Sequence, residues 1–284
     1  MIIPQDGAPT PSTIATAGWT PSISEPERHA SDRIARDLYC QYFDTLVADT
    51  DDLRSEAFRL RYQVYCVENP YEAAADNPEE LEHDDYDERA TQCLLRHKSS
   101  GAWAGTVRLV LPDPDAPFHS FALQEVCDEP MILEGARFPI QRMAEISRFC
   151  ISKDFRKRQG DWLYPGSNTP EDRENDHRVI PNMTLGLIEG LVRMSLESRT
   201  FYWCALMERP LLRLLGRLGI HFENIGPLVV HHGRRQPCFV ELETLLLRVH
   251  EERPDVWETV TAAGRHWDQL KRALAAEPHW IPPS

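Results

Sequence analysis

A glutamate and an arginine interrupt an apolar run near the middle of the sequence. Glu145 and Arg148 belong to the heptapeptide Ala-Glu-Ile-Ser-Arg-Phe-Cys, which is otherwise typical of a buried β-strand. Burying such a pair costs free energy, so its presence in a buried strand indicates that a function or a structural contact requires it. Two more arginines, Arg61 in a helical pattern and Arg108 in a strand pattern, and the acidic run 82–87 precede it. Charges from four separate elements beside apolar residues predict a polar active site, so we expect an enzyme.

The spacing of this charged pair has a geometric consequence. Side chains alternate along a regular strand, so Glu145 and Arg148 point to opposite faces of it. The two can share a site only if the strand bulges between them. We therefore predict a β-bulge in this strand, and a straight strand would count against a shared ionic cluster.

The composition excludes several classes of function. A formal net charge of -14 over 284 residues argues against wrapping nucleic acid or lying on an anionic membrane. The seven cysteines are odd in number and form no Cys-x-x-Cys pair, which favours reduced thiols in a cytoplasm over disulfides or zinc. No segment approaches the ~20 apolar residues of a membrane span. We expect a soluble, cytoplasmic protein with no metal site and no integral membrane segment.

The pattern along the chain predicts one domain between two extensions. Residues 1–30 are rich in Pro, Ser and Thr, which is typical of a mobile leader. Strand and helix patterns alternate over 31–250, which predicts an α/β domain whose mixed sheet is flanked by helices on both faces. Residues 251–284 hold a last helical pattern, near 256–275, that we expect to be an appended helix.

Local patterns place the elements of this domain. The segment 91–111 predicts a β-hairpin through the turn 98–101, and a short helix is expected near Leu123. The segment 153–178 is charged and rich in turn residues, which predicts an inserted loop. The remaining expected elements are a strand at 42–47, a helix opening at Asp51, the strand 144–152, a helix over 182–198 behind Pro181, a strand at 201–206, a helix over 209–218, and closing strands at 221–225, 228–230 and 238–243.

Four motifs stand in order at 61–68, 84–87, 105–109 and 145–149. Their types and order resemble those of acyl-homoserine-lactone synthases and N-acyl amino acid synthases, offshoots of the GCN5-related N-acetyltransferase (GNAT) fold. The resemblance covers about residues 40–245. The later run His-His-Gly-Arg-Arg-Gln-Pro at 231–237 resembles the N-acyl amino acid synthase branch, which includes acyltransferases associated with the PEP-CTERM/exosortase system.

One departure bears on the product. In the lactone synthases an aromatic residue and then a tryptophan follow the first arginine. Tyr65 takes the aromatic place here, but Asn-Pro-Tyr at 69–71 stands where the tryptophan is expected. This departure favours an amino acid as the acceptor over a lactone product.

The resemblance implies a reaction and a set of residues. The reaction is transfer of an acyl group from an acyl-carrier-protein thioester, carried on phosphopantetheine, to the amine of an amino acid, with no cofactor. An amine attacks only when it is neutral, so Glu145 is the first choice of proton acceptor. The arginines either bind the acceptor's carboxylate or balance neighbouring acids. The expected catalytic residues are Glu145, Arg148 and Arg108, and the expected substrate-binding residues are Arg61, Tyr65, Asp84, Asp87 and Ser147.

Two basic patches suggest where an acidic carrier protein docks. Arg209, Arg213 and Arg217 recur at four-residue spacing and so share one helix face. A local positive patch on an acidic enzyme would attract such a partner, although most such faces are only solvated. The second patch comprises Arg156, Lys157 and Arg158.

Other interpretations of these residues stay open. The Glu145–Arg148 pair can be structural, and Asp84 and Asp87 can belong to a solvated acidic loop. Cys66 and Cys150 are expected to be buried thiols rather than nucleophiles, and His231–His232 a hairpin position rather than a metal site. The apolar face Met183, Leu187, Leu191 and Met194 can line an acyl channel or form ordinary core. The alternative functions are a lactone synthase that uses S-adenosylmethionine, and a non-catalytic module that binds acyl-carrier protein.

Overall fold

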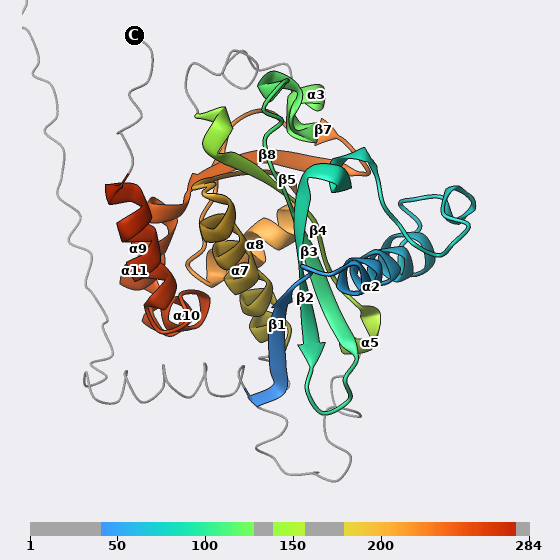
Figure 1. Cartoon of the computed structure of the whole chain (residues 1–284), viewed down its shortest axis with the longest axis horizontal. Coiled ribbons are helices and arrows are strands. Elements are labelled where there is room, and N and C mark those ends of the chain that lie inside the picture. Colours follow the sequence, from blue (N-terminus) through green and yellow to red (C-terminus); the bar gives the residue numbers. More distant parts are fainter. Residues whose placement is uncertain (1–40, 128–138, 157–178, 277–284) are drawn as a thin grey trace, which may run out of the picture.

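The computed structural model describes residues 41–127, 139–156 and 179–276, and in these segments eight strands form one mixed sheet (Figure 1). The sheet order is β1-β2-β3-β4-β5-β8-β6, with β7 paired to β8. Its neighbours run antiparallel except β4 and β5, which run parallel. The strands are β1 (Phe43–Val47), β2 (Ala90–His97), β3 (Trp103–Val110), β4 (Met143–Ile151), β5 (Tyr202–Met207), β6 (Glu223–Asn224), β7 (Val229–Val230) and β8 (Arg234–Glu241).

Helices cover both faces of the sheet, as the alternating pattern predicts. α7 (Val179–Ser198) packs across β1, β2 and β3 on one face, while α2 (Asp51–Tyr62) packs on β2 and β3 from the other (Figure 1). The alternation of strand side chains divides the core accordingly. Cys93 and Leu95 of β2 belong to the large cluster with α7, whereas Leu94 joins the smaller cluster with α2.

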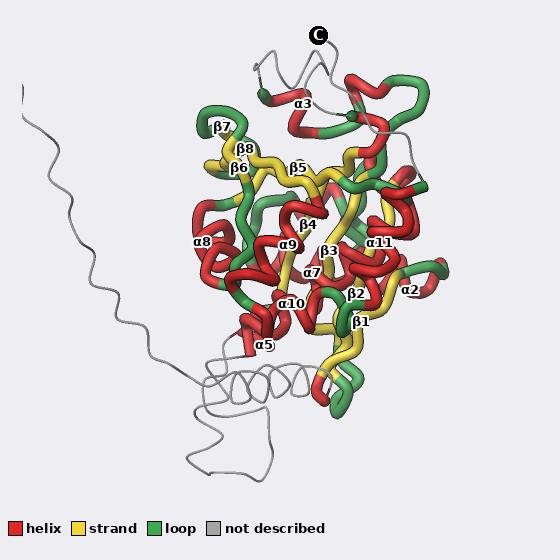
Figure 2. Tube along the Cα trace, turned by 90° about the vertical axis from the view of Figure 1, so that its left-hand side faces the viewer, coloured by secondary structure: helices red, strands yellow, loops and turns green. Residues whose placement is uncertain are grey.

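Three more helices follow the sheet at the C-terminal end: α9 (Leu242–Glu252), α10 (Pro254–Val260) and α11 (Arg265–Ala275). Figures 1 and 2 show them gathered beside α7, and Val256 and Leu270 are buried in the same core cluster as that helix. The pattern predicts one helix over 256–275, but the chain reverses at Ala262, Ala263 and Gly264, all with positive φ. The segment of α9 is not predicted as a helix, because its start continues the apolar pattern of β8.

The central strand β4 carries the predicted bulge. Arg108 of β3 faces Ser147 and Thr106 faces Cys150, so one residue of β3 opposes two of β4, Arg148 and Phe149. Arg148 has φ +50°, the left-handed backbone that turns its side chain away from the regular alternation. The prediction that this strand bulges is confirmed, and the bulge lies at Arg148 and Phe149.

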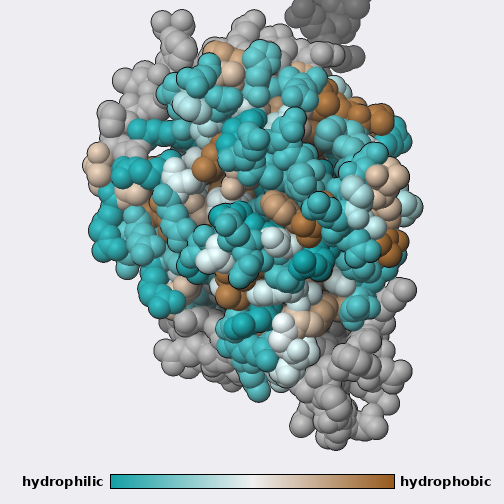
Figure 3. All heavy atoms as spheres, turned by 45° about the vertical axis from the view of Figure 1, so that its right-hand side comes forward, coloured by the Kyte–Doolittle hydropathy of each residue, from teal (hydrophilic) through white to brown (hydrophobic). Residues whose placement is uncertain are grey.

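Two further observations complete the frame. Beyond β4 the chain forms α5 (Lys153–Arg156), and the rest of the predicted loop, like the predicted leader 1–30, lies outside the described residues. None of the helices within the described segments has the length and apolar character of a membrane span. Hydrophilic residues predominate on the face drawn in Figure 3, where apolar residues form small separate patches.

Candidate active site

A pocket of about 520 Å³ lies where β4 and β5 stop pairing. The parallel ladder ends at Ile146 and Ala205, and the residues after it on both strands line the pocket. One wall is apolar and includes Leu206 and Met207 of β5 and Leu211 and Leu214 of α8 (Arg209–Arg217), beside Thr184 of α7. The polar wall includes Tyr65, Glu72, Asp84, Tyr86, Arg108, Glu125, Glu145, Ser147 and Arg148.

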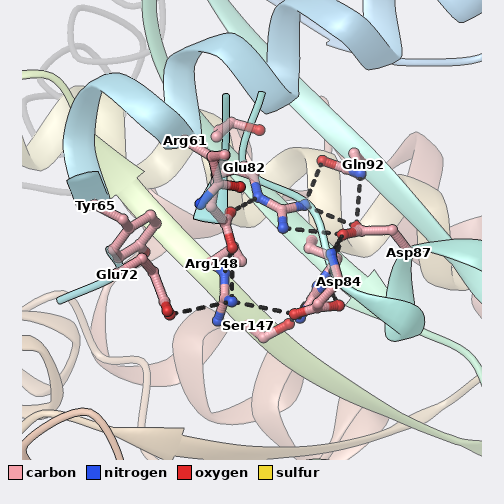
Figure 4. A network of polar contacts seen from close by, with 12 residues as sticks. Arg61, Tyr65, Glu72, Glu82, Asp84, Asp87, Gln92, Ser147 and Arg148 are labelled. Carbon is pink, nitrogen blue, oxygen red and sulfur yellow. Dashed lines mark hydrogen bonds and ion pairs between the residues drawn. The ribbon is translucent and has the colours of Figure 1, made fainter. Parts of the chain in front are cut away.

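Arg61 lies behind the polar wall, fully buried. Its Nε donates to Glu82 at 2.5 Å, and its two terminal nitrogens form a bidentate contact with Asp87 at 2.7 and 2.9 Å (Figure 4). It is presented by the last turn of α2, which runs on into a π-helix over Gln63–Glu68. Neither Arg61 nor Asp87, both expected to bind substrate, lines the pocket; their side chains pair with each other behind it.

Arg108 is the second guanidinium of this network. It donates to Asp84 at 2.5 and 3.1 Å and to Ser147 Oγ at 2.9 Å, and it lies 3.0 Å from Asp87. Asp84 caps the 3₁₀ helix η3 (Asp85–Arg89), where its carboxylate accepts the Tyr86 N–H and its own N–H donates to Asp87. The acidic loop is therefore ordered by its arginine partners rather than being a solvated run.

Arg148, aimed by the bulge, joins the network from β4. Its Nη2 donates to Glu82 at 2.7 Å, to Asp84 at 3.1 Å and to Glu72 at 3.4 Å (Figure 4). The guanidinium also lies 5.6 Å from the centre of the Tyr65 ring, within range of a cation–π contact. We call Arg61, Arg108 and Arg148 with Glu82, Asp84 and Asp87 the arginine network.

Two carboxyls of the arginine network, those of Glu82 and Asp87, are held in their charged form. Burial by itself raises the pKa of both, but the charges and hydrogen bonds of the neighbouring arginines together outweigh it and lower both pKa values to about 2. Burial also raises the pKa of Tyr65 well above its ordinary value, so its phenol stays neutral. Glu82 and Asp87 therefore keep a fixed negative charge near neutral pH.

Glu145 stands apart from this network although it lines the same pocket. Its side chain is 3% exposed, and its two oxygens accept the N–H groups of Ala122 and Leu123, each at 3.0 Å, at the start of α3 (Ala122–Val126). Burial raises the pKa of this carboxyl to about 7, although those N–H groups and Arg108 favour the charged form. No ion pair joins Glu145 to Arg148 among the described residues; they share the pocket, not a contact.

The structure also shows which candidate residues fall elsewhere. Met183, Leu187, Leu191 and Met194 are fully buried in the main core and do not line the pocket. Cys66 and Cys150 are buried, and burial raises the pKa of the Cys66 thiol. His231 and His232 form the turn between β7 and β8, as predicted, and also line the pocket. Arg209, Arg213 and Arg217 are exposed along α8; Arg156 ends α5, and Lys157 and Arg158 lie outside the described residues.

Sequence reasoning missed several residues of the site. Glu72 and Glu82 complete the coordination of Arg148, and Tyr86 donates to Glu125 beside Glu145. Glu82 falls within the acidic run from which only Asp84 and Asp87 were selected. Glu72 lies in a loop and Glu125 on the short helix α3, and no motif in the sequence around either residue indicates that it reaches the pocket.

Comparisons with known proteins bear on the fold that carries this pocket. Residues 60–164 match the family model of an acetyltransferase (GNAT) domain. The structure of TofI in a ternary complex with an inhibitor and MTA superposes with a TM-score of 0.52 at 18% identity, over 75% of this chain and 99% of that one. The chain has a GNAT-type fold. The predicted GNAT-like α/β fold is confirmed.

Two other solved structures are similar at lower scores. The AHL synthase LasI has a TM-score of 0.49 at 19% identity, over 74% of this chain and 95% of that one. FeeM, an N-acyl amino acid synthase from uncultured soil microbes, has a TM-score of 0.45 at 15% identity, over 72% of this chain and 93% of that one. A search of curated proteins found no match.

Proposed function

We propose that this protein transfers a fatty acyl group from an acyl-carrier-protein thioester to the amine of an amino acid. The observation that carries the proposal is Glu145: a buried carboxyl whose pKa is raised to about 7, in a pocket with an apolar wall. A base with a pKa near the working pH is suited to accepting a proton from an amine.

The reaction follows from the placement of that carboxylate. The amine loses a proton to Glu145 as its nitrogen attacks the thioester carbonyl, so the C–N bond forms and the C–S bond then breaks. The protonated Glu145 returns the proton to the departing thiolate, and the products are an amide and a thiol. The negative oxygen of the intermediate needs N–H donors, and the strand edges that no longer pair beyond Ile146 and Ala205 are where we place them.

Arg148 is the arginine that we assign to the acceptor's carboxylate. Arg61 is inaccessible, and Arg108 is only 3% exposed and bonded to Asp84 and Ser147, whereas the Arg148 side chain is 16% exposed in the pocket. Its contact with Glu72 is its longest, at 3.4 Å, so an incoming carboxylate can replace that partner.

The donor would approach from the other wall. Leu206, Met207, Leu211 and Leu214 form an apolar surface suited to an acyl chain. Arg209, Arg213 and Arg217 lie exposed on α8, the same helix that supplies two of those leucines. A carrier protein docked on this arginine row would present its thioester close to the acyl wall.

The test is an assay of the full chain with two donor types and two acceptor types. Acyl-carrier-protein and coenzyme A thioesters of several lengths would be offered with a panel of amino acids or with S-adenosylmethionine, and products identified by mass spectrometry. We expect an N-acyl amino acid and faster turnover with the carrier-protein donor. An acyl-homoserine lactone as the product would favour the alternative synthase, and binding without any product would favour a non-catalytic module.

A further inference from the structure

The helix that binds Glu145 also presents a second carboxylate to the same pocket. Ala122 and Leu123 donate their N–H groups to Glu145, and Glu125, within the next turn of α3, lines the pocket. The hydroxyl of Tyr86, from η3, donates to Glu125 at 2.7 Å. This contact fixes the direction in which Glu125 points, since its side chain is otherwise exposed.

The groups that face Glu145 come from five elements. Arg108 of β3 and Glu125 of α3 carry charge, while Tyr86 of η3, Cys204 of β5 and Cys238 of β8 have pKa values raised by burial and by nearby carboxyls, and so remain neutral. The nitrogens of Arg108 are already bonded to Asp84 and Ser147 and paired with Asp87. Glu125 therefore supplies a negative charge that the arginine network does not take up.

We propose that Glu125, oriented by Tyr86, is a positioning residue that makes Glu145 a better proton acceptor. This inference rests on the proposed function. When Glu145 takes a proton from the amine it changes from anion to neutral acid, and a neighbouring carboxylate favours the neutral product by removing a like-charge repulsion. The α3 N–H groups have the opposite effect, because they favour the anion. The helix α3 therefore acts on Glu145 in two ways. Its first N–H groups hold the carboxylate and stabilise the anion, and Glu125, in the next turn, partly offsets that stabilisation.

A charge series at position 125 tests the inference. The substitutions E125D, E125Q and E125K, made in the full chain, would be compared by carbon-13 NMR titration of the Glu145 carboxyl, whose resonance is identified by its loss in E145Q. We expect the Glu145 titration midpoint to stay within about 0.2 pH unit in E125D, to fall by about 0.5 in E125Q and to fall about twice as far in E125K. Raising the ionic strength should shift the parent towards E125Q and leave E125Q unmoved.

Two controls separate charge from structure. Glu88→Gln removes an exposed carboxylate of η3 that does not line the pocket, and it should leave the Glu145 midpoint unchanged. Tyr86→Phe keeps the charge of Glu125 but removes its anchor, so we expect a downward shift smaller than that in E125Q. Equal shifts in the Asp, Gln and Lys variants, or none, would overturn the inference. The titration needs no turnover, so the inference can fail or hold separately from the proposed function.

Discussion

The carboxyls of Glu82 and Asp87 and that of Glu145 are all buried within one region, yet burial has opposite outcomes for them. The first two face Arg61 at hydrogen-bonding distance, and their pKa values fall to about 2. Glu145 accepts backbone N–H groups, and together with the charge of Arg108 they do not offset its burial, so its pKa rises to about 7. Guanidinium groups at hydrogen-bonding distance therefore keep Glu82 and Asp87 charged in spite of burial.

The arginine network and Glu145 therefore have different roles, although both appear in the sequence simply as charged residues. The arginine network holds the loop 82–89 and the bulge of β4 against α2, and its buried carboxylates Glu82 and Asp87 stay charged near neutral pH. Glu145 is the group that can gain and lose a proton there. The network is structural, and Glu145 is the group that we expect to transfer the proton.

Replacing Glu145 should have the largest effect on turnover. We expect E145Q to lower the rate of amide formation by about 10²–10⁴-fold, because a neutral amide cannot accept the amine's proton. Binding of the acyl-carrier protein should persist, which a titration of labelled carrier protein would measure. Glu88→Gln is the matched control and should retain the parent rate. A tenfold or smaller loss in E145Q would place the base elsewhere.

Replacing Arg61 should chiefly affect the stability of the fold. Arg61→Met removes the fully buried guanidinium that Glu82 and Asp87 share, so we expect the free energy of unfolding to fall by about 3–5 kcal/mol. Arg54→Met is the control, because Arg54 forms an exposed pair with Asp51 on the same helix and should cost about 0–1 kcal/mol. Urea denaturation of both variants gives the comparison. Equal losses would mean that the network does not stabilise the fold.

Glu82 and Asp87 on the one hand and Glu145 on the other should make the free energy of unfolding depend on pH in opposite directions. The unfolded chain binds protons at Glu82 and Asp87 near pH 4 while the native chain binds them near pH 2, so their stabilisation is present above that range and is lost as the pH falls through it. Glu145 is protonated in the native state up to about pH 7, so its contribution is full below about pH 4.5 and is lost as the pH rises through 7. Unfolding measured from pH 2 to 8 should show both slopes, and E145Q should remove only the upper one.

The smallest predicted effect lies outside this comparison, on the exposed arginine row. Reversing Arg213 and Arg217 to Glu should raise the Michaelis constant for the acyl-carrier protein by about three- to tenfold and weaken its dependence on salt, with little change in turnover at saturation. Arg248→Glu, an exposed reversal on α9, is the control. An unchanged Michaelis constant would show that the carrier protein docks elsewhere.

Sequence patterns predicted the parts of this site whose cause is local. The hairpin β2–β3 follows from its turn and alternation, and the bulge follows from two charges at positions that a regular strand separates. Which acidic residues lie beside those charges depends on tertiary packing, so Glu72, in a loop, and Glu125, on α3, carried no signal. The position of Arg61 behind the pocket carried none for the same reason: whether a guanidinium meets a ligand or a buried carboxylate is decided by tertiary packing. The break between α10 and α11 was missed because Ala262 and Ala263 are good helix formers, and only the fold shows their left-handed backbone.

The most direct measurement of the central claim is the pH dependence of a single turnover with donor and acceptor already bound. If Glu145 is the proton acceptor, the rate of amide formation should rise about tenfold per pH unit below about pH 7 and level off above it, while E145Q should be slow and flat over the same range. Parent and E145Q profiles of the same shape, with no inflection near pH 7, would contradict it.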